Sequence, residues 1–322
     1  MSKKIFLDSG NLKLIVYVIG YPEMGESQVV ILKDDISGVI HYSAVIDCYE
    51  YKNINKTNEI LQDHNISELN LLCWTHPDDD HSEGMGSLIS DFCSANTKVL
   101  LPEGIYGSEM DFVDYKPKHL DFFEKLRENN AKRRYNVNSA SVIQDEIKGI
   151  ETIYYVYNLI EFKFRICALA PISAMVRRRF KSGLKNKNDI SIALLVSLGE
   201  LSLFFSGDIE NQTINLIAKE HLPEISFLKT PHHTSKSSDA LLNIFDEVFE
   251  NEYKIPFTCS TAYKKFSLPD VDLVNKYKMY SDSFYSTNDD LSVEDFGYFK
   301  IEFDPFNNKA EVDVRGSARK IF

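Results

Sequence analysis

The densest group of potential metal ligands in the chain is segment 76–81, with the sequence HPDDDH. It places two imidazoles and three carboxylates directly after the apolar run LNLLCWT at 69–75. Imidazole nitrogen and carboxylate oxygen together suit zinc, manganese or iron better than calcium or copper(I). Capping of a helix N-terminus would account for one carboxylate, but not for three carboxylates flanked by histidines. The segment therefore predicts a divalent metal site with the ligands His76, Asp78, Asp80 and His81.

Two later groups extend this set. Asp208 stands in Ser-Gly-Asp after the apolar run LSLFF, and His232 and His233 stand in KTPHHTS after ISFL. Taken singly, such an Asp is typical of a helix N-cap, and adjacent histidines are often only surface polar groups. Because each group follows an apolar strand, all three could meet at one edge of a sheet protein. Together they favour a metal site over packing or capping.

The elements that must position these residues predict a layered α/β fold. Runs rich in Val, Ile and Tyr predict strands, whereas Met85, Leu88, Ile89 and Phe92 have the spacing of a buried helix face. Strands are expected at 12–20, 27–35, 41–50, 69–75, 151–170, 190–208, 225–230, 255–261, 296–304 and 310–315. Helices are expected at 58–66, 119–135, 211–221, 239–251 and 271–282. We interpret 1–322 as a single domain with an insertion at about 103–150.

Composition narrows the class of protein. The chain has 322 residues, 43% of them hydrophobic and 26% charged, as in ordinary globular proteins. A net charge of −12 argues against a generally basic nucleic-acid coat or a binder of anionic membranes. The 5 cysteines include no CxxC pair and no disulfide-like spacing. The first twenty residues lack the apolar core of a signal peptide, so we expect a reduced, cytoplasmic protein with no membrane partner.

One basic segment departs from this acidic background. Residues 175–187 (MVRRRFKSGLKNK) contain no acid and are expected to form a loop between two strands. The loop could grip a phosphate backbone, with Phe180 available to stack on a base. It could equally be a solvated loop without a partner. The candidate substrate-binding residues are Arg177, Arg178, Arg179 and Lys181.

The three polar groups resemble the signature of the metallo-β-lactamase superfamily, in which HxHxDH precedes a bridging Asp and a late His. They are most similar to the hydrolase domain of the DNA-uptake protein ComEC and its soluble relatives. That subgroup shows HxDxDH, matched by 76–81, Thr/Ser-Gly-Asp, matched by 206–208, and a Lys-x-x-His-His-Gly-Ser segment, matched by 229–235. Weaker matches are Gly-Glu-Ser at 25–27 and Ile-Asp-Cys at 46–48.

The resemblance implies an αββα sandwich that binds two divalent ions, zinc or manganese, with magnesium as a further option. One ion would be held by His76, Asp78 and the bridging Asp208. The second would be held by Asp80, His81, Asp208 and one of His232 and His233. The implied chemistry is attack of a metal-activated hydroxide on a phosphodiester.

The same resemblance supplies the candidate catalytic groups. Asp79 or Asp80 would orient or deprotonate the attacking water. His232 would donate a hydrogen bond to the phosphate if His233 is the ligand. Lys229 would also donate a hydrogen bond to the phosphate. Equally, it could be an ordinary solvated Lys at the end of a strand.

The sequence thus favours a metal-dependent phosphodiesterase, in particular a nuclease whose partner is nucleic acid. A protein partner in a multi-component system is a further hypothesis. Two alternatives stay open. One is a hydrolase of a small phosphodiester, cyclic nucleotide or ester. The other is a binding or scaffold module with a degenerate metal site, supported by Thr234 in place of the expected Gly and Leu268 in place of the expected His.

Overall fold

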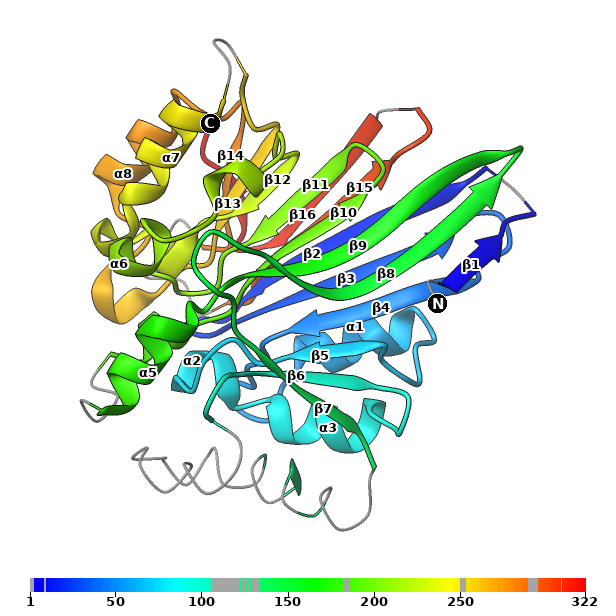
Figure 1. Ribbon diagram of the computed structural model, residues 1–322, viewed down its shortest axis with the longest axis horizontal. Helices are drawn as coiled ribbons and strands as arrows, with labels where there is room; N and C mark the ends of the chain where they lie inside the picture. The colour runs from blue at the N-terminus through cyan, green and yellow to red at the C-terminus, as the bar shows by residue number, and fades with distance from the viewer. Residues whose placement is uncertain are drawn as a thin grey trace.

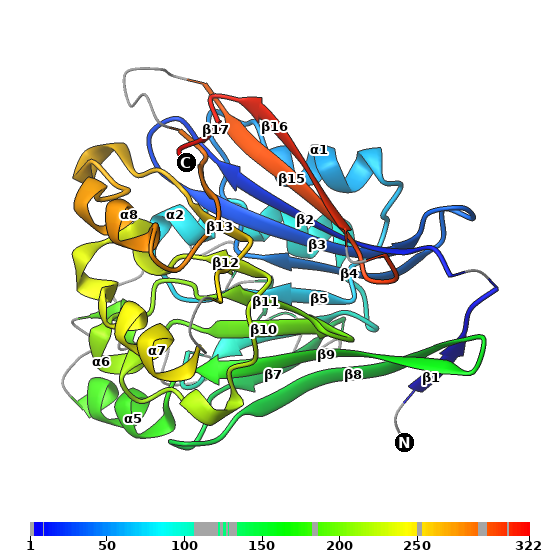
Figure 2. The ribbon, with the colours of Figure 1, turned by 90° about the horizontal axis from the view of Figure 1, so that it is seen from above.

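The computed structural model describes most of the chain as two β-sheets packed face to face, with helices on their outer sides (Figures 1 and 2). The described residues are 3–8, 10–105, 122, 125–126, 128, 134–181, 186–249, 253–288, 295–307 and 309–322. The statements below concern these residues. Among them, no helix is both long and apolar enough to cross a membrane.

The first sheet joins the N-terminal strand to the second half of the chain. Its spatial order is β1 (Lys3–Phe6), β8 (Lys148–Tyr157), β9 (Ile160–Ala170), β10 (Ala193–Leu198), β11 (Leu201–Phe205), β12 (Phe227–Lys229), β13 (Phe257–Ser260), β14 (Phe284–Ser286) and β17 (Arg319–Lys320). Strands β11 to β14 are parallel, so the loops at their carboxyl ends leave from one edge.

The second sheet contains most of the first third of the chain. Its order is β16 (Lys309–Gly316), β15 (Gly297–Asp304), β2 (Leu12–Gly20), β3 (Glu26–Asp34), β4 (Ile40–Ile46), β5 (Leu71–Cys73), β6 (Lys98–Pro102) and β7 (Asn136–Ala140). The first five strands are antiparallel and β4 to β7 are parallel. Strand β2 is buried along almost its whole length, because other elements cover both of its faces.

Three apolar layers hold the sandwich together. The middle layer joins the facing sides of the two sheets through residues such as Val16 and Phe205. A second layer packs α1 (Lys56–Asp63) and α3 (Met85–Phe92) against the second sheet. A third packs α7 (Ala240–Val248) and α8 (Val271–Tyr277) against the first sheet. This order of helix, sheet, sheet and helix confirms the predicted αββα sandwich.

Several local predictions need correction. The basic segment predicted as a loop begins instead with α5 (Ser173–Lys181), because Met175 and Val176 bury an apolar helix face. The helix expected at 211–221 is reduced to α6 (Asn211–Ile214) and a 3-10 turn at Lys219–His221. Strands β1, β6, β7, β14 and β17 were not predicted.

The region interpreted as an insertion has described residues mainly at its two ends. Strand β7 pairs with β6, and β8 begins at Lys148, so both ends belong to the sheets. The helix predicted at 119–135 lies largely outside the described residues. The single-domain interpretation with an insertion stays a prediction.

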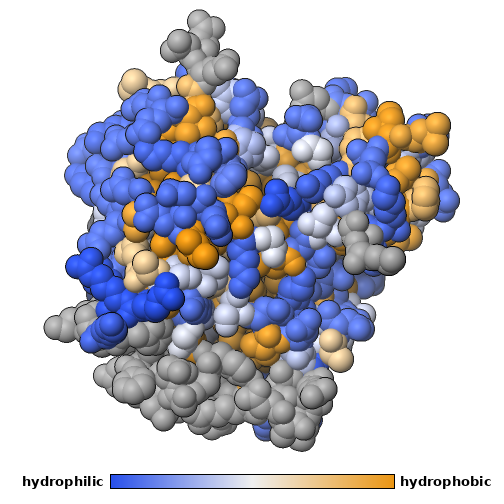
Figure 3. All heavy atoms as spheres, viewed as in Figure 1, coloured by the Kyte–Doolittle hydropathy of each residue, from blue (hydrophilic) through white to orange (hydrophobic). Residues whose placement is uncertain are grey.

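Exposed apolar side chains gather at the far end of the β8–β9 hairpin, at the right of Figure 3. Phe6 is 77% exposed, Leu159 99% and Ile160 58%. Much of the remaining surface in this view is hydrophilic. The predicted metal ligands lie at the opposite end of the strands.

Candidate metal centre

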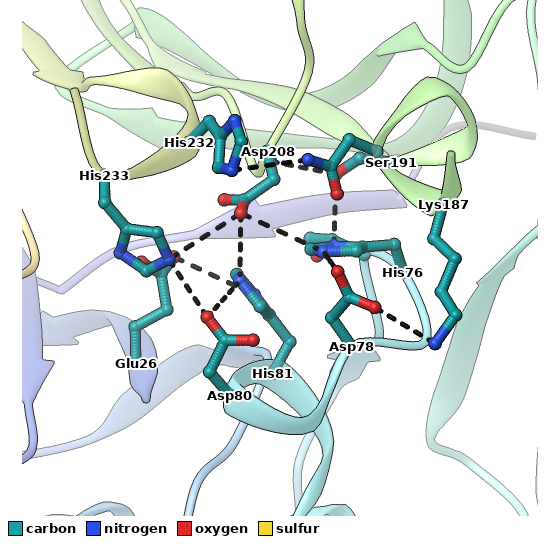
Figure 4. A network of polar contacts seen from close by, with 12 residues as sticks. Glu26, His76, Asp78, Asp80, His81, Lys187, Ser191, Asp208, His232 and His233 are labelled. Carbon is teal, nitrogen blue, oxygen red and sulfur yellow. Dashed lines mark hydrogen bonds and ion pairs between the residues drawn. The ribbon is translucent and has the colours of Figure 1, made fainter. Parts of the chain in front are cut away.

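The predicted metal ligands meet at one edge of the sandwich, although they come from both sheets. Segment 76–81 follows β5 of the second sheet and includes all but the last residue of α2 (Asp79–Ser82). Asp208 follows β11 of the first sheet, and His232 and His233 follow β12. Because β4 and β5 are parallel, as are β11 and β12, each sheet carries its own loops at one edge. The contacts of Asp208 with His81 and of His233 with Asp80 join the two edges. Figure 4 shows the side chains directed toward a common centre.

Four buried side chains form the tighter half of this cluster. His233 Nε2 lies 3.0 Å from Asp80 Oδ2, and His81 Nε2 lies 3.4 Å from the same oxygen. Asp208 Oδ2 lies 3.4 Å from His81 Nε2 and 3.7 Å from His233 Nε2. Ligands about 2.1 Å from a tetrahedral zinc ion are about 3.4 Å from one another. The spacing of the four donors therefore fits one divalent cation.

His76 and Asp78 form the other half. His76 Nε2 lies 3.5 Å from Asp78 Oδ2 and 3.9 Å from Asp208 Oδ2. The same oxygen of Asp208 thus faces both halves, which is the position of a bridging carboxylate. Asp78 is 38% exposed and its Oδ1 lies 3.1 Å from Lys187 Nζ, so this half is more open than the first.

The hydrogen bonding of the cluster supports a bound cation. Among the described residues, His76 Nε2, His81 Nε2 and Asp208 Oδ1 are buried without a hydrogen-bond partner. Buried polar atoms in folded proteins are ordinarily satisfied. Three such atoms in one cluster indicate that a further group belongs among them. Their chemistry, imidazole nitrogen and carboxylate oxygen, fits zinc or manganese.

Outer residues orient two of the histidines. Asp47, directly after β4, lies with its Oδ2 2.7 Å from His81 Nδ1 and accepts hydrogen bonds from the backbone and hydroxyl of Thr75. With Nδ1 engaged, His81 presents Nε2 to the centre. Ser191 Oγ accepts a hydrogen bond from the Asp208 backbone at 3.0 Å and lies 3.5 Å from His76 Nδ1. The sequence signal for Asp47 was only the weak family match at 46–48.

Replacing Asp47 by Asn is expected to weaken metal binding about 10- to 100-fold, because outer partners of metal-bound histidines have effects of this size. The side chain keeps its shape, but one oxygen becomes an NH₂ donor, so it can no longer accept all three hydrogen bonds from the Thr75 backbone, the Thr75 hydroxyl and His81. Competition with a chelating dye measures the affinity for zinc or manganese. Asp63→Asn, at the exposed end of α1, is the matched control and should bind as the wild type does. An unchanged affinity in Asp47→Asn would contradict the orienting role.

A buried ion pair beneath the centre was not predicted. Lys229 Nζ lies 2.9 Å from Glu26 Oε2, and both side chains are 0% exposed. Glu26 also accepts hydrogen bonds from Gln28 and Thr261. The Thr261 hydroxyl in turn lies 2.8 Å from His233 Nδ1. The ammonium group of Lys229 is thus buried in an ion pair with Glu26 and is not exposed to solvent.

Glu26 is close enough to His81, Asp208 and His233 to act as a fourth ligand with them. It approaches the imidazoles on their Nδ1 sides, however, at 4.0 Å for His81 and 3.3 Å for His233. Asp80 lies on the Nε2 sides, where the donor atoms converge. Asp80 therefore faces the converging donor atoms, and Glu26 lies outside them.

The two adjacent histidines differ in orientation. His233 is buried, with its Nε2 among the ligand atoms described above. His232 is 24% exposed, and its Nδ1 lies 2.9 Å from Ser237 Oγ and 3.1 Å from Glu210 Oε1. Its Nε2 lies 3.4 Å from Asn188 Nδ2. The geometry thus places the Nε2 of His233, and not that of His232, among the donor atoms of the cluster.

The charges in the cluster stabilise one another. Burial would raise the pKa of Asp208, but His81 and His233 hold it well below its ordinary value. Burial would lower the pKa of His81, but Asp208 and the other nearby carboxylates raise it well above its ordinary value. Burial likewise acts to raise the pKa of Glu210, which the hydrogen bond with His232 brings down to about 2. A cation bound by His81 therefore replaces a proton.

A cavity of about 210 Å³, called the metal pocket below, opens onto the centre. Its lining consists of Asp78, Asp79, Asp80, Asp208, His232, Tyr263 and Phe266. The candidate catalytic residues Asp79, Asp80 and His232 therefore share the pocket, whereas Lys229 is not part of the lining. The sequence analysis did not predict Tyr263 and Phe266 as site residues. From their loop it named only Leu268, which replaces the expected His.

The candidate substrate-binding residues lie on α5. Arg177, Arg178 and Lys181 are exposed. Arg179 instead forms an ion pair with Asp189 and donates a hydrogen bond to Gln212, which ties α5 to the 3-10 turn before β10 and to α6. The side chain of Phe180 lies outside the described residues.

The comparisons with known proteins concern overall structure only. No family model and no curated protein matches the chain. Among solved structures, a diphosphatase from the PhnP family is similar at 11% identity and a TM-score of 0.36, over 76% of this chain and 85% of that one. The metallo-β-lactamase fold protein YhfI from Bacillus subtilis is similar at 12% identity and a TM-score of 0.40, over 85% and 95%. A candidate metal-dependent hydrolase from Parabacteroides distasonis is similar at 10% identity and a TM-score of 0.38, over 82% and 88%.

Proposed function

We propose that the protein is a divalent-metal-dependent phosphodiesterase, and in particular a nuclease. The observation that carries the proposal is the position of Asp208, whose Oδ2 faces the donors of both halves of the centre beside the metal pocket. Two ions sharing one carboxylate suit displacement at phosphorus, where charge develops on both the attacking and the leaving oxygen.

The residues divide this work among them. His76, Asp78 and Asp208 would hold one ion, and Asp80, His81, Asp208 and His233 the other. When bound, such ions lower the pKa of a coordinated water and neutralise phosphate oxygens. Asp79 lines the pocket and orients the attacking water. His232, held by Glu210, donates a hydrogen bond to a phosphate oxygen.

The choice of nucleic acid as substrate rests on two further features. The motifs at 76–81, 206–208 and 229–235 are those shared with the ComEC-like subgroup. The exposed Arg177, Arg178 and Lys181 of α5 supply positive charge for a phosphate backbone in an otherwise acidic protein. The small volume of the metal pocket, about 210 Å³, favours as second candidate a hydrolase of a small phosphodiester.

The test is cleavage of single-stranded, duplex and plasmid DNA and of RNA, with manganese, magnesium, zinc or a chelator. We expect metal-dependent cleavage by the wild type and none above background by Asp208→Ala prepared in parallel. Cleavage that persists in Asp208→Ala would indicate a contaminating nuclease. Failure of metal-loaded protein to cut any polynucleotide or small phosphodiester would overturn the proposal.

The triple variant Arg177→Ala, Arg178→Ala, Lys181→Ala separates the two candidate substrates. A nuclease should lose activity on DNA and much of its salt dependence, while hydrolysis of a small ester is retained. Equal activity of both proteins on DNA would favour the small-phosphodiester candidate.

A further inference from the structure

The loop of residues 263–268 carries an exposed aromatic ring at the rim of the metal pocket. Phe266 is 59% exposed, yet it lines both the metal pocket and a second cavity of about 350 Å³. His232 lines both cavities as well, so they adjoin. The second cavity, called the side cavity below, is completed by Ser235, Lys236, Leu268 and Asp270.

Backbone hydrogen bonds hold this loop in place. Tyr263 and Leu268 exchange two of them, at 3.0 and 3.1 Å, and close the loop at its base. The Lys264 backbone donates to Glu23 at 2.8 Å, which ties the loop to the turn before β3. The Tyr263 ring lies edge-on to that of Phe266, with 5.0 Å between centroids. The ring of Phe266 is therefore presented to solvent on a supported loop, the arrangement of a contact site rather than of a packing residue.

The charges of the two cavities differ. The metal pocket is lined by four aspartates that would bind cations and, through them, a phosphate. In the side cavity, Lys236 lies 3.4 Å from Asp270 and 3.2 Å from Asp272, so these carboxylates offset its charge. An aromatic wall beside paired charges and a hydroxyl suits a flat, uncharged ring with hydrogen-bonding edges. Lys265 Nζ, 5.2 Å from the centre of the Phe266 ring, adds positive charge for a neighbouring phosphate.

We propose that Phe266 forms a base-stacking subsite, so that the substrate is a phosphodiester with an unpaired nucleobase next to the scissile phosphate. This inference rests on the function proposed above and specifies its substrate class. A base paired and stacked within a duplex cannot reach the side cavity, whereas an unpaired base stacks on an aromatic face whatever its sequence. Single-stranded nucleic acid and nucleotide esters should thus be preferred over duplex.

The test compares esters that share one leaving group. Thymidine 5′-(p-nitrophenyl phosphate) and its 3′ isomer carry a base, whereas methyl p-nitrophenyl phosphate does not. We expect the wild type to hydrolyse at least one nucleoside ester with the higher kcat/KM. Phe266→Ala should lower that value by about 5- to 150-fold, the effect of losing one stacked base. Because the methyl ester has no base to stack, its kcat/KM should change much less in Phe266→Ala than that of the nucleoside ester. Phe266→Trp should retain the preference.

A binding measurement provides a readout that needs neither metal nor turnover. A dinucleoside methylphosphonate containing 2-aminopurine has no charged phosphate, and stacking quenches its fluorescence. Quenching is expected with the wild type and Phe266→Trp, and not with Phe266→Ala. Val271→Ala is the control, because Val271 is 72% exposed but lines neither of the two cavities.

The outcomes separate this inference from the proposed function. If the wild type hydrolyses the methyl and nucleoside esters equally, or if Phe266→Ala slows all of them alike, the stacking subsite is refuted while the phosphodiesterase stands. If no ester is hydrolysed but quenching depends on Phe266, the proposed reaction fails and the base subsite remains. Absence of quenching by the wild type would count against the subsite and would make a protein partner the next explanation for the exposed ring.

Discussion

Replacing Glu26 by Ala is expected to destabilise the metal-free protein by about 3–5 kcal/mol, because it removes the ion-pair partner of the buried Lys229. Both side chains are 0% exposed and only 2.9 Å separates their charged atoms. Burial would lower the pKa of Lys229, but Glu26 and Asp208 raise it, so the amine is charged in the folded state. Urea unfolding in the presence of a chelator measures the change.

Two controls show whether the cost comes from the unpaired charge. The double variant Glu26→Gln, Lys229→Met removes both charges at similar volume and should recover most of the lost stability. Glu59→Ala breaks the pair of Lys56 and Glu59, which has the short distance of 2.7 Å but is exposed, and should cost less than about 1 kcal/mol. If Glu26→Ala costs no more than Glu59→Ala, the buried pair does not stabilise the fold.

The second large effect is expected at His233. Its replacement by Ala removes a donor that lies 3.0 Å from Asp80 Oδ2 and 3.7 Å from Asp208 Oδ2. Because loss of an outer partner already weakens binding 10- to 100-fold, loss of a ligand should weaken the affinity for metal by more than about 100-fold. One of the two proposed ions should then be missing after dialysis, as counted by elemental analysis.

His232→Ala is the matched variant one position away. It should keep the full metal content, because its imidazole contacts Ser237 and Glu210 rather than the ligand atoms. Its effect should appear in the rate of hydrolysis. Equal metal loss in both variants would show that the two histidines were assigned incorrectly.

The fold could be predicted, and the residues that meet at the candidate centre could be singled out, because their signals are local. An apolar run followed by polar residues, as at 69–81, is visible along the chain, and so is the helical spacing from Met85 to Phe92. The error at α5 has a physical cause. The charges of Arg177 to Arg179 suggested a loop, but the buried side chains of Met175 and Val176 determine a helix.

The residues that support the ligands could not be predicted, because their partners are distant in the sequence. Thr261 donates to Glu26 across 235 positions, and no periodicity relates the two. The sequence also could not show which of His232 and His233 faces the centre. Both residues have left-handed backbones, with φ of 48° and 52°, and only this turn directs one ring to the centre and the other to Glu210.

The origin of the ligands in both sheets means that a bound ion would also act as a cross-link. Asp80 follows β5 of one sheet and His233 follows β12 of the other, 153 positions later. An ion held by both residues would link the two sheets at this edge of the sandwich. Any ligand that binds only the folded state adds about 2.7 kcal/mol of stability at a hundred times its dissociation constant. The concentration of free metal in the surroundings would therefore set part of the stability of the sandwich, in addition to the proposed activity.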